Sequence, residues 1–291
     1  MHIAIILTTY NRKELLQKTL LKIKGLIIPR NVITSIIVIE DGCTDATAQM
    51  LKEEFAGIIV IHTEGNYFWT KCMNLGFRKA VEINSTFVLI LNDDIEIEEN
   101  YLSNLLNDYS KLPAESILGS ASISKSVPHK VESGGTKDFI KWRLKFKPYF
   151  KGFTKVDENF NGIHKSWTLS GRGTLIPCSL FEKIGYYDEN LIQYGSDDEF
   201  CLRANINKIP VYITWNARIL NHTNSTSVGS AFKKEGLMIL LKSFFNKYSV
   251  NSLSKNIYLY NKYSYKLLTP IYVLYLIVGT IKAYYFNYKN D

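Results

Sequence analysis

The chain has 291 residues, 46% of them hydrophobic and 21% charged, with a formal net charge of +8. This composition excludes an intrinsically disordered chain, and the length allows one large domain or two small ones. The positive charge favours an anionic partner, but it does not by itself distinguish nucleic acid, a phosphorylated substrate and an anionic membrane surface.

The N-terminal residues and the cysteines indicate where the protein works. The run Met1–Leu7 has no basic segment ahead of its apolar residues, so we expect a first strand and not a secretory signal. Four cysteines are widely spaced and form no CxxC pair: Cys43, Cys72, Cys178 and Cys201. This spacing argues against a disulfide framework or a zinc site, and we expect a cytoplasmic protein.

Strand-like and helix-like patterns alternate over the first 125 residues. Short apolar or β-branched runs predict strands at Ile3–Leu7, Ile33–Ile39, Ile58–Ile61, Phe87–Leu91 and Ile117–Ser122. Helix-like segments lie between them, near residues 12–23, 45–55, 70–83 and 99–109. Continuous apolar strands separated by helices predict an α/β fold with a mainly parallel sheet covered on both faces.

Ligands of such sheets bind outside the carboxyl ends of the strands. Four polar clusters directly follow predicted strands: Thr8–Asn11, Glu40-Asp41, Glu64–Trp69 and Asn92–Asp94. We expect all four clusters to open on one edge of the sheet, where they would form a single site.

The second half of the chain is less regular. Residues 125–165 show no clear period, and we interpret them as a variable insertion or lid. Regular patterns return at residues 167–177, 179–184 and 196–207. From about Ala231 the chain is expected to be helical, and it is rich in Lys, Tyr and Phe.

The most apolar run is Leu267–Ile281, which contains Pro270 and Gly279 and ends before Lys282. Its length is below the roughly 20 residues needed to span a bilayer. Aromatic residues and lysines flank it, and this pattern predicts a helix lying in the plane of a membrane surface through residues 267–286. A core helix of a C-terminal subdomain, or a homodimer contact, is the alternative.

Asn92-Asp93-Asp94 comes directly after an apolar strand. Adjacent carboxylates repel each other, so a nearby cation lowers the cost of ionising both. Hard oxygen ligands with open positions suit Mg²⁺ or Mn²⁺ that bridges substrate phosphates. The alternative is a solvated acidic turn that caps the helix starting near Glu98.

Glu40 and Asp41 form a second acidic pair at a strand end. Such carboxylates can accept hydrogen bonds from a ribose hydroxyl or a uracil-type N–H. Helix N-capping is the alternative, although Thr44 or Asp45 can already fill that role. The first turn, Thr8–Arg12, contains no glycine, and no P-loop motif occurs, which counts against dehydrogenase and P-loop enzymes.

The segment Gly195–Phe200 places three acids, Asp197, Asp198 and Glu199, ahead of a helix. Acids in a first helical turn are favourable on dipole grounds alone, but three in a row exceed what capping requires. A carboxylate here can act as general base toward an acceptor hydroxyl. His222 follows a strand-like segment and, taken alone, is more typical of a packed or exposed histidine than of a ligand.

In this order, the motifs resemble those of the family 2 glycosyltransferases with the GT-A fold. Ile5–Arg12 is similar to the family's first strand and nucleotide-base loop, and Val38–Asp45 to its VVDDGSTD motif. Asn92–Asp94 matches the DXD segment, Ser196–Arg203 resembles EDVDLCLR, and residues 65–74 resemble a loop of rhamnosyl- and galactofuranosyl-transferase-like members. The resemblance covers about residues 2–228. It implies a Rossmann-like GT-A sheet flanked by helices, with a C-terminal helical extension.

The resemblance also implies roles for single residues. Asp94, supported by Asp93 and His222, would bind Mn²⁺ or Mg²⁺, and Asp197 would be the catalytic base of an inverting transfer. Glu40 and Cys43 differ from the residues usual at their positions, as does Ser196, whereas the core acids are kept. The implied donor contacts are Thr8, Tyr10, Asn11, Arg12, Glu40, Asp41, Trp69, Asn74 and Asp93. Among them, the ring of Trp69 can stack on a sugar.

We therefore expect an enzyme that moves a sugar from a nucleotide-diphosphate sugar to a glycan or lipid-linked acceptor in cell-surface polysaccharide synthesis. It would act at the cytoplasmic face of the membrane, without nucleic acid. Two alternatives stay open. One is a sugar nucleotidyltransferase, which normally has a glycine-rich basic loop that this sequence lacks; the other is a non-catalytic module that binds nucleotide-sugar or anionic lipid. The expected domains are residues 1–228, with a nucleotide-sugar half 1–125 and an acceptor half 126–228, and a helical region 229–291.

Overall fold

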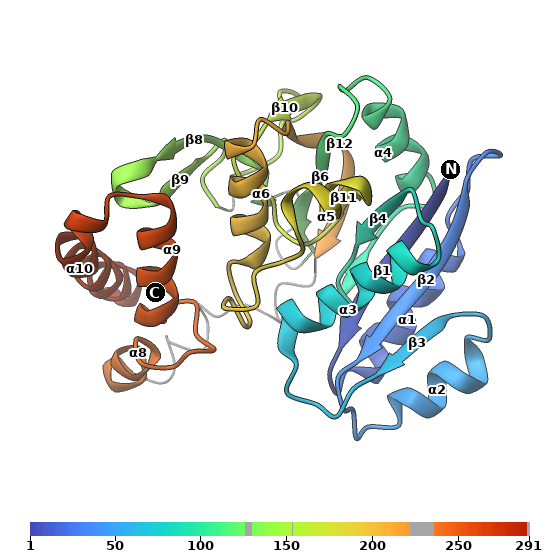
Figure 1. Cartoon of the computed structure of the whole chain (residues 1–291), viewed down its shortest axis with the longest axis horizontal. Coiled ribbons are helices and arrows are strands. Elements are labelled where there is room, and N and C mark those ends of the chain that lie inside the picture. The colour runs from blue at the N-terminus through green and yellow to red at the C-terminus, as the bar shows by residue number, and fades with distance from the viewer. Residues whose placement is uncertain (126–129, 153, 222–235, 290–291) are drawn as a thin grey trace.

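The computed structural model describes residues 1–125, 130–152, 154–221 and 236–289, which form an α/β protein (Figure 1). The helices are α1 (Lys13–Lys24), α2 (Thr47–Glu54), α3 (Phe68–Glu82), α4 (Tyr101–Tyr109), α5 (Ser179–Ile184), α6 (Ser196–Ile206), α8 (Leu237–Ser243), α9 (Leu253–Tyr263) and α10 (Thr269–Lys289), with short 3₁₀ turns η1 (Lys141–Arg143) and η2 (Lys266–Leu268). The strands are β1 (His2–Thr9), β2 (Ile33–Glu40), β3 (Ile59–His62), β4 (Phe87–Ile90), β5 (Ile95–Glu96), β6 (Ile117–Ser124), β7 (Lys130–Ser133), β8 (Thr136–Ile140), β9 (Lys145–Pro148), β10 (Ile163–Lys165), β11 (Thr174–Pro177) and β12 (Val211–Asn221).

Among the described residues, ten strands form one sheet in the order β10-β12-β6-β11-β4-β1-β2-β3, with β5 beside β12 and β7 beside β6. Strands β3, β2, β1 and β4 are parallel to one another, and β12 is parallel to β6. The antiparallel β11 lies between β4 and β6. The predicted α/β fold with a mixed, mainly parallel sheet is confirmed.

Strand β1 shows why the sheet needs helices on both faces. Ala4 and Ile6 belong to one core cluster, with side chains of α3, α5 and α6. Ile3, Ile5 and Leu7 belong to the other cluster, with side chains of α1, α2 and α4. Successive side chains of a strand point to opposite faces, so a strand that is apolar at every position must bury both faces. The predicted double covering is therefore confirmed.

Residues 130–165 form short strands where the sequence predicted an irregular insertion. Strands β7 and β10 join the main sheet, and β8 and β9 form a separate hairpin around η1. Phe139 and Phe146 stack across this hairpin with ring centroids 5.0 Å apart. Strands this short offer too few positions for a period to appear in the sequence.

Helices α8, α9 and α10 lie at the end of the molecule away from β2 and β3 (Figure 1). Helix α9 is attached to α6 through Glu199, whose buried carboxylate accepts hydrogen bonds from Arg203 at 2.9 Å, from Lys262 at 2.9 Å and from Tyr263. Lys262 also pairs with Asp188 at 2.6 Å. Charge-assisted hydrogen bonds of this kind are among the stronger ones in proteins. They join the C-terminal helices to the helix that begins with the acidic run.

Glu199→Gln is expected to lower the free energy of unfolding by about 3 kcal/mol, because it removes a buried negative charge shared by Arg203 and Lys262. Urea unfolding followed by circular dichroism measures the change. Glu182→Gln, an exposed change in α5, is the control and should alter stability by less than about 0.5 kcal/mol. Equal stability of the two variants would show that this network does not secure the C-terminal helices.

The C-terminal helix is longer than the apolar run predicted. Residues Lys266–Tyr285 form 20 residues that are long and apolar enough to cross a membrane, by length and composition, and almost none of this segment is buried. Pro270 does not break the helix because it lies in the first turn of α10, where its missing N–H costs nothing. The argument that the run is too short to span is therefore wrong. Contact with a membrane or with a second subunit stays a prediction.

Candidate active site

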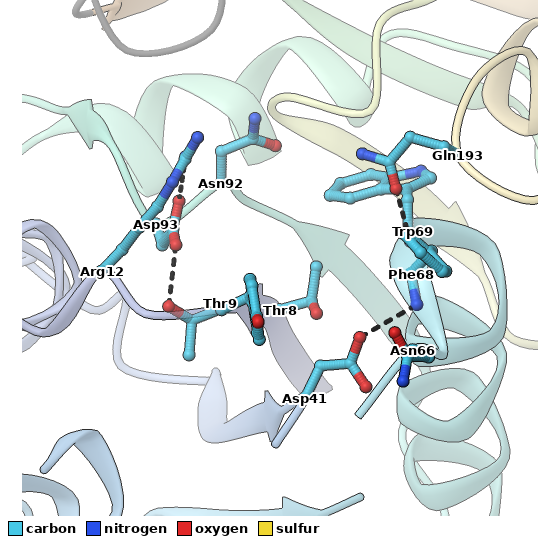
Figure 2. Close-up of a pocket in the computed structure, with 11 residues that line it drawn as sticks. Thr8, Thr9, Arg12, Asp41, Asn66, Phe68, Trp69, Asn92, Asp93 and Gln193 are labelled. Carbon is cyan, nitrogen blue, oxygen red and sulfur yellow. Dashed lines mark hydrogen bonds and ion pairs between the residues drawn. The ribbon is translucent and has the colours of Figure 1, made fainter. Parts of the chain in front are cut away.

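A cavity of about 470 Å³ opens where β1, β2 and β4 end (Figure 2). Residues from all four predicted clusters line it, and so does Gln193, which was not predicted. The complete lining is Thr8, Thr9, Tyr10, Arg12, Asp41, Asn66, Phe68, Trp69, Asn92, Asp93 and Gln193. Small-molecule sites typically have volumes of roughly 300–1,000 Å³. The predicted convergence of the four clusters at one sheet edge is confirmed.

The acidic turn after β4 forms one wall of this cavity. Thr9 Oγ1 donates to Asp93 Oδ2 at 2.8 Å, and Thr19 Oγ1 donates to the Asp93 carbonyl at 2.9 Å. Arg12 Nη1 lies 3.1 Å from Asp93 Oδ1 and 3.3 Å from Asp94 Oδ2. Burial raises the pKa of Asp93 to about 6; the charge of Arg12 opposes this shift, and the charge of Asp94 adds to it. Keeping Asp93 ionised therefore costs free energy, and a cation beside it would reduce that cost.

The oxygen atoms of this turn fit a hard divalent cation. One guanidinium nitrogen of Arg12 touches an oxygen of each carboxylate, so both can reach a single positively charged atom. Asn92 Oδ1 is buried and has no hydrogen-bond partner among the described residues. Mg²⁺ is usually held by one or two carboxylates, and substrate phosphates and waters fill its other positions. Asp93 and Asp94, with Asn92 beside them, therefore meet the requirement, and Arg12 stands where the cation would bind.

The predicted further metal ligand, His222, lies outside the described residues. Within the described ranges, no group of three or more His, Cys, Asp or Glu side chains is placed to hold a metal ion.

Arg12→Met should lower the free energy of unfolding in EDTA by about 2 kcal/mol, because two nearly buried carboxylates lose their counter-charge. Mn²⁺ should then stabilise this variant more than it stabilises the wild type. Scanning calorimetry in EDTA and in Mn²⁺ measures both effects. Lys13→Met removes a neighbouring positive charge and serves as the control. An identical response of the two variants to Mn²⁺ would contradict the idea that Arg12 occupies a cation position.

Asp41 fixes the loop that precedes α3. Its carboxylate accepts hydrogen bonds from Thr63 Oγ1 at 2.6 Å and from the N–H groups of Tyr67 and Phe68 at 3.1 Å and 3.0 Å. A carboxylate at a helix N-terminus is favourable for the unpaired N–H groups there. Figure 2 shows Asp41 at the edge of the cavity. The carboxylate that was predicted to bind the nucleoside is therefore also the one that orders this loop.

Glu40, a predicted donor contact, is absent from the cavity lining. Its carboxylate accepts a hydrogen bond from the Cys43 N–H and pairs with His62 Nδ1 at 2.9 Å. Burial alone would raise the pKa of Glu40, but hydrogen bonds with His62 and Cys43 outweigh it and lower the pKa. These contacts hold the turn after β2. A role for Glu40 in donor binding stays a prediction.

Two predicted asparagines also lie outside the cavity lining. Asn11 adopts a left-handed backbone conformation with φ 51°, and its Oδ1 accepts a hydrogen bond from the Thr44 N–H at 2.7 Å. Asn74 is buried in α3, where its amide bonds both the N–H and the carbonyl of Tyr187, at 3.0 Å and 2.9 Å. Both side chains thus shape loops around the cavity, and direct donor contacts from them stay predictions.

Asp197 lies beside the wall of the cavity that Trp69 forms. Its Oδ2 accepts a hydrogen bond from the Gly171 N–H at 2.8 Å. A Cβ on Gly171 would lie 2.5 Å from Trp69 Cζ2 and 3.5 Å from Asp197 Oδ2, so only glycine lets these three residues pack together. Figure 2 shows Trp69 across the cavity from Asp93. Asp197 and Asp94 are themselves absent from the cavity lining, and their roles as base and metal ligand stay predictions.

The acidic run has an unusual electrostatic setting. Desolvation raises the pKa of Asp197, although the Gly171 N–H and the charges of Arg172 and Lys255 work against the shift. Desolvation and the negative charge of Asp197 also raise the pKa of Asp198. A half-buried carboxylate with a raised pKa is a better proton acceptor than an ordinary aspartate.

Two residues near the site were not predicted. Gln193 Oε1 accepts a hydrogen bond from the Trp69 N–H at 3.1 Å, and the side chain lines the cavity. Lys255 belongs to α9, and its charge acts on Asp197. Gln193 lies two residues before Gly195, where the acidic motif begins, so its position in the chain was a usable signal. No local pattern points to Lys255.

A protein-family model described as Glycosyl transferase family 2 matches residues 4–185. The chain is 24% identical over 204 residues to the low-salt glycan biosynthesis hexosyltransferase Agl10 of Haloferax volcanii, covering 69% of this chain and 61% of the relative. It is 26% identical over 192 residues to a poly-β-1,6-N-acetyl-D-glucosamine synthase of Staphylococcus epidermidis, covering 65% of this chain and 43% of the relative. The chain thus spans less than two thirds of either relative's length.

A solved structure has the same fold. The mannosyltransferase PcManGT of Pyrobaculum calidifontis, in complex with GDP-Man and Mn²⁺, superposes with a TM-score of 0.58. The match covers 99% of this chain and 72% of that chain at 14% identity. At this identity the likeness concerns the fold alone.

Proposed function

The chain belongs to glycosyl transferase family 2 and has the GT-A fold, and we propose that it transfers a sugar, with inversion, from a nucleotide-diphosphate sugar to a glycan or lipid-linked acceptor. One observation supports this most: Asp93 and Trp69 line a single cavity at the carboxyl edge of the sheet, and Asp197 lies next to Trp69, just outside the cavity lining. A hexosyltransferase and a polysaccharide synthase among the relatives support the same reaction class. The nucleotidyltransferase alternative has no such support.

We assign the donor diphosphate to the side of the acidic turn. Asp94 and Asp93, with Asn92 beside them, would hold Mn²⁺ or Mg²⁺. A bound cation would neutralise the charge that develops on the departing nucleoside diphosphate. The Mn²⁺ and GDP-Man of the mannosyltransferase neighbour support this assignment. Asp41 and Tyr10 are assigned to the nucleoside, and Trp69 offers its ring to the sugar.

Asp197 is assigned as the general base. Its carboxylate accepts the proton of the acceptor hydroxyl while that oxygen attacks the anomeric carbon, on the face opposite the leaving diphosphate. The glycosidic bond forms as the bond to the diphosphate breaks, so a single displacement inverts the anomeric configuration. No covalent glycosyl-enzyme is involved. Gly171 holds the carboxylate in place through the N–H bond at 2.8 Å.

Sugar transfer should become faster as pH rises, because only the ionised form of Asp197 accepts a proton. Desolvation raises the pKa of Asp197, so this increase should extend above the usual aspartate value of 3.8. The dependence of kcat/KM on pH, from about pH 4 to about pH 9, measures it. A rate that is already constant from about pH 4 upward would contradict a base with a raised pKa.

A panel of uridine, thymidine and guanosine diphosphate sugars tests the proposal, with Mn²⁺, Mg²⁺ or EDTA present. Release of nucleoside diphosphate should occur with one nucleoside class and should require the metal. Failure of all three classes with metal present would contradict the donor assignment. Incubation with sugar 1-phosphate and nucleoside triphosphates is the control, since pyrophosphate release there would instead favour a nucleotidyltransferase.

We also propose that the protein works at the cytoplasmic face of a membrane, with residues 1–228 as the catalytic domain and 229–291 as the part that meets the membrane. The exposed, apolar segment Lys266–Tyr285 supports this location. The residues packed beside this segment indicate what kind of lipid it contacts.

A further inference from the structure

A second cavity, of about 170 Å³, lies between the β8–β9 hairpin and the C-terminal helices. Its walls are almost entirely apolar or aromatic, and they include Trp142, Arg143, Tyr260, Ile271, Tyr272 and Tyr275. An apolar cavity of about 150 Å³ stays dry and accepts a molecule the size of benzene. This cavity is therefore large enough for a short piece of hydrocarbon chain. None of the residues that line it lines the candidate active site.

Arg143 gives this apolar cavity a positive edge. Its guanidinium carbon lies 4.2 Å from the ring centre of Trp142 and 5.2 Å from that of Tyr275. Arg143 Nε is buried and has no hydrogen-bond partner among the residues that the structure describes. Arginine is well suited to phosphate, because its planar fork can donate two parallel hydrogen bonds. The side chain is held between aromatic rings, and its Nε–H is left to bind a ligand.

The surroundings of Arg143 are strongly basic. Lys141 and Lys145, its neighbours in the hairpin, are exposed. The hairpin is fixed to the C-terminal helices because the carbonyls of Lys141 and Trp142 accept hydrogen bonds from Ser264 and Tyr260, at 2.6 Å and 2.9 Å. Positive charge and the apolar C-terminal helix therefore belong to one surface of the molecule.

The 3₁₀ turn η2 and helix α10, beside this basic turn, expose large apolar side chains. Leu267 is 95% exposed, Leu274 64% and Ile271 59%, and Ile271 also lines the cavity. A face of this kind needs a partner that is apolar and, next to Arg143, anionic. In a two-fold dimer the same patch meets itself, so the basic turns of the two copies would be brought near each other. Charge complementarity favours a phosphate-bearing lipid over a second copy of the chain.

We propose that the β8–β9 turn and helix α10 form a binding site for an anionic phospholipid of the membrane. Arg143, with Lys141 and Lys145, binds the lipid phosphate, the 170 Å³ cavity takes the adjoining part of the acyl chain, and the exposed side of α10 contacts the hydrocarbon. This inference rests on the proposed membrane location and adds to it the lipid class and the residues. It also gives the hairpin a role that the sequence did not indicate.

The site is connected to the candidate active site through α9. Tyr260 of this helix lines the lipid cavity, whereas Lys262 and Tyr263 bind Glu199 of α6, the helix that begins beside Asp197. A lipid bound at the hairpin would therefore set the orientation of α6 relative to the membrane. This arrangement suits an acceptor that is itself attached to a lipid.

Co-sedimentation of the full chain with vesicles tests the site. We expect binding to vesicles of phosphatidylcholine mixed with phosphatidylglycerol, and little binding to phosphatidylcholine alone. The triple variant K141Q/R143Q/K145Q should bind about 100-fold more weakly, since each basic residue near an anionic surface contributes about fivefold. The triple variant K18Q/K22Q/K52Q, with the same charge change on α1 and α2, is the control and should bind within about threefold of wild type. Ile271→Gln, which keeps the charge, should also weaken binding.

Several outcomes would overturn this site. Equal binding to the two vesicle types would exclude an anionic headgroup, and equal loss in the two triple variants would show only a general effect of net charge. A dimer in light scattering that Leu274→Gln dissociates, with vesicle binding unchanged, would assign α10 to a second copy. The proposed function is judged separately: the hairpin variant should release nucleoside diphosphate from the donor in solution at the wild-type rate. A wild-type protein that binds vesicles but turns over no donor would contradict the proposed transferase activity, whereas the proposal of a lipid site would still hold.

Discussion

Asp197→Asn is expected to lower kcat for sugar transfer by about 1,000-fold, while the dissociation constant for the nucleotide-sugar changes by less than about threefold. General base catalysis typically contributes 10²–10⁴-fold, and asparagine cannot accept the acceptor's proton. The side chain keeps its shape, and its carbonyl oxygen can still accept the hydrogen bond from Gly171. Steady-state kinetics and calorimetric titration of the donor measure the two quantities.

Asp198→Asn is the matched control for this result. Asp198 is the next residue in the same helical turn, and we assign it no direct part in proton transfer. Its removal takes away a negative charge close to Asp197, so we expect a change in the pH dependence of transfer and at most about a tenfold change in rate. Unchanged transfer by Asp197→Asn, or collapse in the Asp198 variant alone, would remove the assignment of Asp197 as the base.

Asp94→Asn should lower kcat/KM at limiting Mn²⁺ by at least about 100-fold and weaken Mn²⁺ binding in the presence of nucleoside diphosphate. The variant replaces a charged oxygen ligand with a neutral one, and hard divalent cations depend on carboxylates in such sites. Titration of Mn²⁺ followed by electron paramagnetic resonance measures the affinity directly.

Glu98→Gln is the control for the metal ligand, because it removes an exposed negative charge just beyond the acidic turn. Its Mn²⁺ affinity should stay within about threefold of wild type, as expected for a solvent-screened charge. If Asp94→Asn binds Mn²⁺ as the control does, the metal is held by other residues.

The sheet and the position of the site could be predicted because their signals are local. Every position of Ile3–Leu7 is apolar, which requires burial on both faces, and the first polar residues after each strand mark its carboxyl end. The sheet order follows largely from that rule and from the helices between the strands. This is why the sequence alone is enough to assign Thr8, Asp41, Trp69 and Asp93 to one site.

The direction of individual side chains could not be predicted, since it depends on contacts far along the chain. Arg12 was expected on the donor, but its guanidinium lies against Asp93 and Asp94, some eighty positions away. Glu40 precedes the turn that its own carboxylate holds, and Asn74 is bound to Tyr187 in the other half of the protein. Composition at a strand end therefore identifies a site more readily than it identifies which of its residues face the ligand.

The irregular part of the chain was hardest to interpret for a similar reason. The β8–β9 hairpin has few residues per strand, and aromatic stacking and packing on α9 stabilise it more than alternation does. The basic character of Lys141–Lys145 was visible in the sequence. Its place beside α10 depends on tertiary contacts, and without them the charge had no identifiable partner.

Anomalous diffraction from crystals grown with Mn²⁺ and the nucleoside diphosphate selected by the donor panel tests the proposed active site most directly. We predict a manganese peak within about 2.0–2.6 Å of an Asp94 carboxylate oxygen, with the diphosphate beside it in the 470 Å³ cavity. Arg12 should no longer contact both aspartates. Manganese and nucleotide bound elsewhere on the molecule, with Arg12 still on Asp93 and Asp94, would contradict the proposed site.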